Sequence, residues 1–139
     1  MNQTLVLIKP QAVSRGLSGS IIARYEAKGL KLTSIKMVQA EEALLASHYQ
    51  EHLGKPFYAN LITTMQQGPL VALVIEGVDA VTAARMLNGA TDPLKAAPGT
   101  IRGDYGLEMA HNVVHASDSS LNAAREIALW FPELCGSKG

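Results

Sequence analysis

The sequence predicts an α/β sandwich in which helices cover a four-stranded, mainly antiparallel sheet. Short runs of apolar, often β-branched residues, typical of strands, occur at residues 5–8, 30–38, 70–75 and 112–116. Segments with helical spacing of apolar residues alternate with these runs. The chain has 139 residues, of which 47% are hydrophobic. We therefore expect one domain, spanning residues 1–139, with a single hydrophobic core.

The first strand and the first helix are separated by a proline and a glycine-punctuated loop. The run Leu5-Val6-Leu7-Ile8 is continuously apolar, as in a strand that is buried on both faces. Pro10 ends this strand because proline has no N–H to donate to a neighbouring strand. A helix is expected over residues 20–28, and Gly29 marks its end.

The second strand, at residues 30–38, has an interrupted pattern. Leu30 and Leu32 alternate with polar residues, but after Ser34 the apolar positions Ile35 and Met37 change phase. Such a change predicts a β-bulge or a strand at the edge of the sheet. Two helices are expected after it, over residues 41–52 and 57–67.

The second half of the chain repeats the strand-and-helix order. After the buried strand at residues 70–75 we expect a helix over residues 79–87, an irregular loop over 90–108, the last strand, a helix over 121–131 and a flexible tail over 133–139. A long irregular loop in a small domain usually serves function. Split βαβ units in this order predict a ferredoxin-like arrangement.

The charge balance argues against a nucleic-acid or membrane partner. Twelve basic residues balance twelve acidic ones, so the chain has no general attraction for polyanions. Cys135 is the single cysteine, which excludes an intrachain disulfide and fits a reducing, cytoplasmic location. The N-terminal apolar run is too short for a signal peptide or a membrane span.

One short motif suggests metal chemistry. The segment His48-Tyr49-Gln50-Glu51-His52 fits the H-x-x-E-H pattern of some zinc peptidases. On a helix its two histidines would share a face, and Glu76 or Glu108 would have to supply a third ligand. A zinc hydrolase that uses His48, Glu51 and His52 is therefore one alternative. Patterns this short also recur by chance, and the chain contains no P-loop and no Gly-x-Gly-x-x-Gly turn.

His115 stands where a strand passes into a helix. The apolar pair before it is typical of a strand, and Ser117, Asp118 and Ser119 are all suitable N-caps for the helix that follows. A neutral imidazole held at such a junction could act as a nucleophile at neutral pH. The alternative is a histidine that only fills or caps the end of the strand.

Three cations occur at separate places that could serve a phosphate chain. Lys9 follows the first strand, Arg85 lies in a helix and Arg102 lies in the long loop. Each alone is most simply a solvated surface charge. Together with polar residues such as Thr91 and Asn112, they are the groups that polyphosphate recognition requires.

Several ordered motifs resemble those of one family. They are Ile8-Lys9-Pro10, Arg15-Gly16-Leu17, His48-Tyr49, Lys55-Pro56-Phe57, Gly68-Pro69-Leu70-Val71, Asn88 to Pro93, Pro98 to Asp104 and Asn112 to Ser119. From near its start to about Phe131, the chain resembles nucleoside diphosphate kinases of the bacterial type.

The resemblance implies a phosphotransferase with a ping-pong mechanism. His115 would accept the γ-phosphate of a nucleoside triphosphate as phosphohistidine, and a nucleoside diphosphate would then take it. Mg²⁺ would be the cofactor, carried by the nucleotide phosphates and not by protein side chains. The family resemblance also implies a homo-oligomer, either a hexamer or a tetramer built from dimers.

The resemblance also implies roles for individual residues. Arg85, Thr91 and Arg102 would hold the β- and γ-phosphates. Lys9 and Asn112 would hold the ribose hydroxyls, and Lys9 would also reach toward the transferred phosphate.

The remaining implied roles concern the nucleophile and the base. Tyr49 would lie against His115, while Ser117 and Glu126 would orient its imidazole. Phe57 would stack on the base, which suits many nucleosides because every base has a π-face; the alternative is a Phe57 in the core. Asp118 is interpreted as a helix cap and not as a catalytic group.

Three positions depart from the usual family pattern. Gln11 replaces an aspartate, Ala116 replaces a glycine after the histidine, and His111 also differs. A methyl group at Ala116 would be strained if that residue needed a positive φ. No residue with an implied direct role is replaced, so we expect an active enzyme. The alternative is an inactive nucleotide-binding or scaffold protein of the same fold.

Overall fold

The computed structural model describes residues 2–136. Its elements, in chain order, are β1 (Asn2–Ile8), α1 (Pro10–Ser14), α2 (Ser18–Lys28), β2 (Lys31–Val38), α3 (Glu42–His48), the 3₁₀ helix η1 (Gln50–His52), α4 (Tyr58–Met65), β3 (Leu70–Gly77), α5 (Ala80–Asn88), α6 (Ile101–Tyr105), the 3₁₀ helix η2 (Met109–His111), β4 (Val114–Ala116), α7 (Ser120–Trp130) and α8 (Pro132–Gly136). Within residues 2–136, no helix has both the length and the apolar character that a membrane crossing requires.

The strands form one sheet in the order β2-β3-β1-β4. Each neighbouring pair is antiparallel, which confirms the predicted four-stranded α/β fold. β1 and β3 are central, and β4 is a short edge strand that pairs with β1 alone. In that pairing, His115 lies opposite Leu7.

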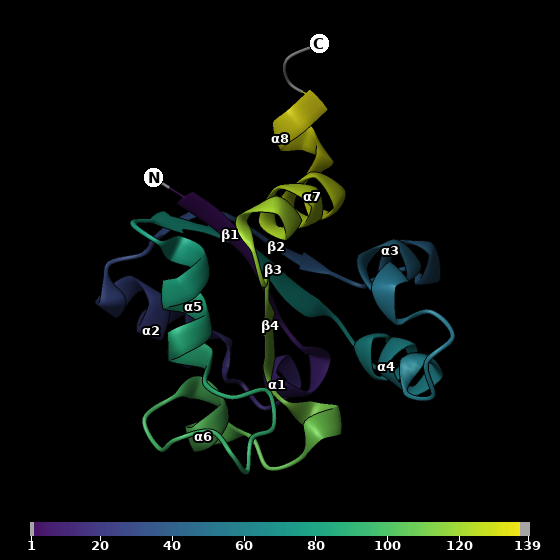
Figure 1. Ribbon diagram of the computed structural model, residues 1–139, viewed down its shortest axis with the longest axis horizontal. Helices are drawn as coiled ribbons and strands as arrows, with labels where there is room; N and C mark the ends of the chain where they lie inside the picture. Colours follow the sequence, from purple (N-terminus) through teal and green to yellow (C-terminus); the bar gives the residue numbers. More distant parts are fainter. Residues whose placement is uncertain (1, 137–139) are drawn as a thin grey trace.

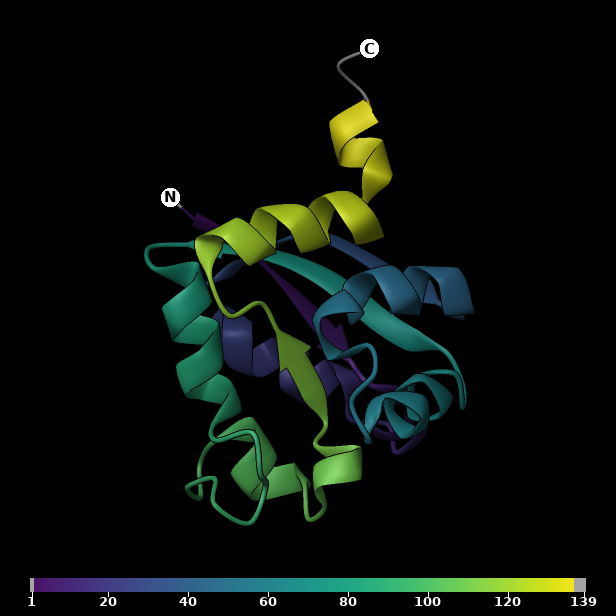
Figure 2. The same ribbon diagram turned by 45° about the vertical axis from the view of Figure 1, so that its right-hand side comes forward.

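Both faces of the sheet are covered by helices, with the strands between them (Figure 1). One apolar cluster joins Val6 and Ile8 of β1 to α2 and α5, and the other joins Leu5 and Leu7 to α3, α4 and α7. This two-sided burial explains why the central strands are continuously apolar. Turning the molecule shows α7 lying along one end of the sheet, near α3 (Figure 2).

β2 lies at the edge of the sheet, and its pairing is irregular where the sequence pattern is interrupted. Its pairing with β3 shifts register between Leu32 and Ser34, as at a β-bulge. Ile35 and Met37 are 52% and 64% exposed, because they lie on an edge strand beyond this shift. Of the two predicted alternatives, a bulge and an edge, the edge position is confirmed, and the register shift lies where the apolar pattern changes phase.

Three short helices were not predicted. α1 begins at Pro10, where a missing N–H costs nothing in the first helical turn. α6 interrupts the expected irregular loop, because the Thr100 side chain accepts a hydrogen bond from the Gly103 N–H and caps the helix. α8 covers part of the expected tail, where Glu133 pairs with Lys36 at 2.9 Å. Residues 137–139 of that tail lie outside the described residues.

Candidate active site

A cleft of about 500 Å³ opens beside β4. Nine of the ten residues with implied roles line it: Lys9, Tyr49, Phe57, Arg85, Thr91, Arg102, Asn112, His115 and Glu126. The tenth, Ser117, is fully buried behind Glu126. Residues that are spread over more than a hundred positions in the chain therefore meet at one place.

A tight turn positions the strand that carries His115. Val113 has φ +78°, an unusual value for a β-branched residue, and the Val114 N–H donates to the Asn112 carbonyl at 2.9 Å. The Val113 carbonyl accepts from the Lys9 N–H at 2.9 Å. Val114 and Ala116 then pack into the cluster shared with α2 and α5. Because side chains alternate along a strand, His115 faces the other side of the sheet, toward α3 and α7.

The His115 ring is oriented by a buried carboxylate. Its Nε2 lies 2.9 Å from Oε1 of Glu126, and the Ser117 hydroxyl donates to the same oxygen at 2.8 Å. Glu126 is 5% exposed. An ionised carboxylate can only accept hydrogen bonds, so Nε2 carries the ring proton in the neutral imidazole. The lone pair is then on Nδ1, which is the arrangement that a nucleophile requires.

Lys9 is a buried cation at the end of β1. It is 8% exposed, and its Nζ donates to Oδ1 of Asn112 at 2.7 Å. Burial, followed by the positive charge of Arg102, lowers the pKa of Lys9 to about 8. The Asn112 amide also donates to the Thr91 carbonyl at 3.2 Å, which ties Lys9 to the long loop.

Arg102 joins the backbone segments around the cleft by hydrogen bonds. Its guanidinium donates to three carbonyls, those of Gly89 at 2.8 Å, Asn112 at 3.0 Å and Val114 at 2.7 Å. Burial is the main reason that the pKa of Arg102 is lowered to about 10. Its other N–H groups remain for a ligand. A polar hollow of about 130 Å³ lies between Arg102 and the exposed Arg85.

Two aromatic residues lie on the α3–α4 side of the cleft. Tyr49 is 6% exposed and its ring meets that of His115 edge-on, with centroids 6.5 Å apart. Burial raises the pKa of the Tyr49 hydroxyl. Phe57 is 49% exposed, so the alternative that it belongs to the core is wrong. Its ring contacts that of His52 at 5.3 Å.

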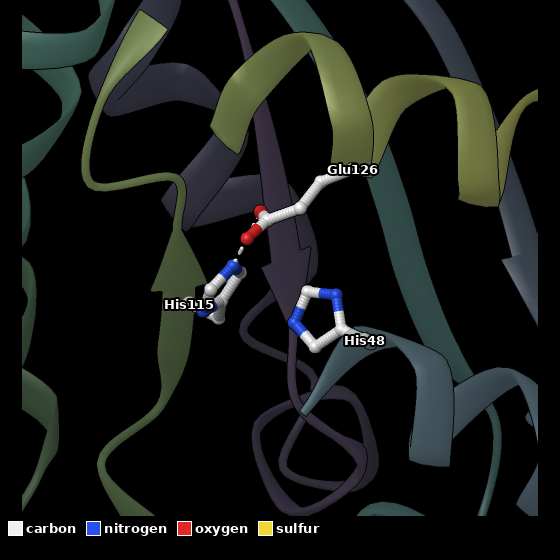
Figure 3. Close-up of side chains that lie close together, drawn as sticks. All are labelled: His48, His115 and Glu126. Carbon is white, nitrogen blue, oxygen red and sulfur yellow. Dashed lines mark hydrogen bonds and ion pairs between the residues drawn. The ribbon is translucent and has the colours of Figure 1, made fainter. Parts of the chain in front are cut away.

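The H-x-x-E-H segment does not form a zinc site. α3 ends at His48 and η1 carries Glu51 and His52, so the two histidines do not share one α-helical face. The expected third ligands have other partners: Glu76 accepts from Gln3, and Glu108 pairs with His111. Within residues 2–136, the group of three potential metal ligands is instead His48, His115 and Glu126 (Figure 3).

This second group is also unsuited to a metal ion. His48 accepts a hydrogen bond from the Trp130 indole at Nδ1, 2.9 Å away. An indole N–H only donates, so Nδ1 must be unprotonated and Nε2 must carry the proton. A neutral imidazole that binds a metal through Nε2 would need its proton on Nδ1, against the indole N–H. His115 and His48 are instead held by hydrogen bonds, His115 to Glu126 and His48 to Trp130.

The backbone angles and the lining of the cleft bear on two of the three positions that depart from the family pattern. Ala116 is not among the residues with positive φ, so its methyl group causes no backbone strain. Gln11 is exposed on α1 and does not line the cleft.

The predicted capping role of Asp118 is wrong, because Ser119 caps α7 by accepting from the Asn122 N–H. Asp118 instead lines the cleft and accepts from the Asn122 side chain at 2.6 Å.

His48 and Trp130 were not predicted as parts of this site. His48 appeared in the alternative zinc motif and in the family motif His48-Tyr49 without a role beside His115. Trp130, which packs in the apolar cluster with α3 and α4, was given no role. The spacing of Glu126 and Trp130, four residues apart on one helix, was the available signal that they share a face.

Comparison with known proteins agrees with this geometry. The sequence model for the family described as nucleoside diphosphate kinase matches residues 2–134. The chain is 56% identical over 133 residues to a nucleoside diphosphate kinase of Saccharopolyspora erythraea, covering 95% of this chain and 98% of the relative. It is also 56% identical to that of Nocardia farcinica, covering 94% and 95%.

Solved structures show the same fold at high identity. The apo nucleoside diphosphate kinase of Encephalitozoon cuniculi has a TM-score of 0.93 and 42% identity, covering 94% of this chain and 89% of that one. A halophilic nucleoside diphosphate kinase of Halobacterium salinarum in complex with CDP has a TM-score of 0.91 and 48% identity, covering 94% and 87%. This chain therefore belongs to the nucleoside diphosphate kinase family, and it is an enzyme that transfers the γ-phosphate of a nucleoside triphosphate to a nucleoside diphosphate.

Proposed function

We propose that His115 is the nucleophile of this transfer. Nδ1 attacks the γ-phosphorus, a P–N bond forms, and the bond from the γ-phosphorus to the β,γ-bridging oxygen breaks to release the diphosphate. A second nucleoside diphosphate attacks the phosphohistidine, which restores the imidazole. The observation that carries this proposal is the bond from Nε2 of His115 to buried Glu126, which leaves the lone pair on Nδ1. Ser117 supports Glu126 in that role, and Tyr49 limits the motion of His115.

The phosphates are proposed to bind between Arg85, Thr91 and Arg102. These residues line the cleft and enclose its polar hollow, where guanidinium groups can offset the charge of the transferring group. Lys9 and Asn112, hydrogen-bonded to each other, are proposed to hold the ribose hydroxyls, with Lys9 also near the transferred phosphate.

The base is proposed to stack on Phe57. Its half-exposed ring at the edge of the cleft is available for such contact, whereas a core phenylalanine would not be. Stacking makes little distinction among bases, which suits a kinase with several nucleoside substrates.

Mg²⁺ is proposed as the divalent cation of the reaction. Mg²⁺ prefers oxygen ligands, and two carboxylates that line the cleft are engaged by side chains: Glu126 by Ser117 and His115, and Asp118 by Asn122. The nucleotide phosphates are therefore the expected ligands, and the bound ion would reduce their negative charge. The residues of this chain supply orientation and cationic contacts instead.

A homo-oligomer, either a hexamer or a tetramer of dimers, and a cytoplasmic location are also proposed. Ile35 and Met37 on the edge strand β2 present apolar surface that an oligomer would cover. The lone Cys135 is consistent with a reducing compartment. Light scattering of the purified protein tests the first proposal, and a monomer would contradict it.

The proposed nucleophile is tested by intact mass spectrometry after incubation with ATP and Mg²⁺. One added phosphoryl group is expected, lost in acid and discharged by GDP. His115→Ala should abolish the adduct, and the matched variant His111→Ala, in η2, should keep it. An adduct that persists in His115→Ala would overturn the proposal. Nucleotide binding without any adduct would favour the inactive-binder alternative.

A further inference from the structure

His48 is buried between Trp130 and His115. It is 4% exposed, and its ring lies at steep angles to both neighbours, with centroids 4.5 Å from His115 and 5.5 Å from Trp130. None of the roles proposed above uses this histidine. A buried polar side chain beside the nucleophile therefore has no assigned purpose.

The protonation of His48 follows from its neighbour. The Trp130 indole donates to Nδ1 at 2.9 Å, so the ring proton of neutral His48 is on Nε2. Burial, followed by the charge of His115, lowers the pKa of His48 well below its usual 6.5, which keeps the ring neutral. Trp130 thus selects one tautomer of His48.

The protonated nitrogen of His48 is directed at His115. Nε2 is buried and has no hydrogen-bond partner among the described residues. Figure 3 shows a nitrogen of the His48 ring on the edge that faces His115. The two rings are nearly perpendicular, at an interplanar angle of 77°, which is the relative orientation that an N–H group needs to approach a π-face.

The ring contact with His48 restricts a rotation of the His115 ring that the hydrogen bond to Glu126 leaves free. The hydrogen bond to Glu126 fixes Nε2 and the covalent bond to Cβ fixes the opposite side of the ring, but the ring can still turn about the axis through these two points. Tyr49 also meets the ring edge-on, but its centroid is 6.5 Å away, against 4.5 Å for His48. A perpendicular ring pressed against its face limits this rotation. We propose that His48, held in its Nε2–H tautomer by Trp130, is a positioning residue that fixes the plane of the His115 imidazole and so the direction of Nδ1. This inference rests on the proposed role of His115 as nucleophile.

Three substitutions separate the parts of this contact. His48→Asn places an oxygen near the Trp130 indole but removes the donor toward His115, whereas His48→Gln restores an N–H near the ε position. Trp130→Phe keeps an aromatic ring but removes the indole N–H that donates to Nδ1 of His48 and so selects its tautomer. Melting curves and ADP titrations identify variants that fold and bind. The readouts are the single-turnover rate of His115 phosphorylation by ATP and the ¹⁵N chemical shifts of both imidazoles.

We expect His48→Asn to slow phosphorylation about tenfold, because a misdirected nucleophile loses near-attack geometry, with the ADP Kd changed less than twofold. His48→Gln should recover most of the rate. Trp130→Phe should turn the ¹⁵N spectrum of His48 into that of a tautomer mixture.

Two results would overturn the inference. One is a wild-type ¹⁵N spectrum with the His48 proton on Nδ1, which needs no variant and no activity. The other is equal phosphorylation rates in wild type and folded His48→Asn. A wild-type protein that forms no phosphohistidine would instead defeat the proposed function, and the spectrum would still report whether Trp130 sets the tautomer.

Discussion

Nζ of Lys9 and Oδ1 of Asn112 form a 2.7 Å hydrogen bond, although the two residues are 103 positions apart in the chain. Both side chains are buried. The bond joins the end of β1 to the turn that precedes β4, so a cation is held in the cleft before any nucleotide arrives. Burial there, together with the positive charge of Arg102, lowers the pKa of Lys9 to about 8.

Nucleotide binding at pH 8 should take up about half a proton through Lys9. Near its pKa, about half of the ligand-free Lys9 is neutral, and a phosphate beside Nζ favours the charged form and raises the pKa. At pH 6 Lys9 is already charged, so this uptake should vanish. Calorimetric titration with ADP in buffers of different ionisation enthalpy measures it. Lys9→Met should lose the uptake, and Lys28→Met, on α2, should keep it.

Glu126→Gln should slow phosphorylation of His115 by about 10- to 100-fold. The amide can still accept from Nε2, but it no longer supplies negative charge behind the ring, and Ser117 competes for the same oxygen. ADP affinity should change little. Glu133→Gln, at an exposed position of α8, is the matched control. Rapid-quench kinetics that give equal rates for both variants would contradict the proposed role of Glu126.

Ala116→Gly should leave turnover within about twofold of wild type. Because Ala116 does not have a positive φ, restoring the usual glycine relieves no strain. Glycine in a strand loses more conformational entropy on folding, so the free energy of unfolding should fall by about 0.5–1 kcal/mol. Steady-state assays and urea unfolding measure the two quantities. A large gain in rate would show that the methyl group hinders catalysis.

Gly103→Ala should destabilise the fold by about 1–3 kcal/mol and weaken nucleotide binding. A Cβ at Gly103 would overlap the Ala97 carbonyl, and the resulting shift would disturb neighbouring Arg102. Gly19→Ala in α2 is the control, because its Cβ meets nothing within 4 Å and alanine favours helix. Urea unfolding and ADP titration separate the two effects. Similar results for both variants would refute this explanation.

The sequence predicted the sheet better than it predicted the short helices. Leu5 and Leu7 face one cluster while Val6 and Ile8 face the other, so a continuous apolar run indicated two covered faces. α6, in contrast, depends on the Thr100 cap and on packing of Ile101, which no periodicity over five residues can reveal. Helices this short are determined by their surroundings.

For the site, residue patterns alone indicated His115 and scattered cations, and the family resemblance supplied the roles. Burial could not be predicted for Lys9 or Arg102, whose charges are typical of the surface. Trp130 has the pattern of a core residue, and only the fold shows that its indole reaches His48.

β4 spans only three residues, and its register against β1 decides which way His115 points. One residue inserted between the Val113 turn and Ser117 would turn the imidazole toward α2 and α5 and bring an apolar neighbour into the cleft. β4 can therefore accept a substitution such as Ala116→Gly, but not a single added residue.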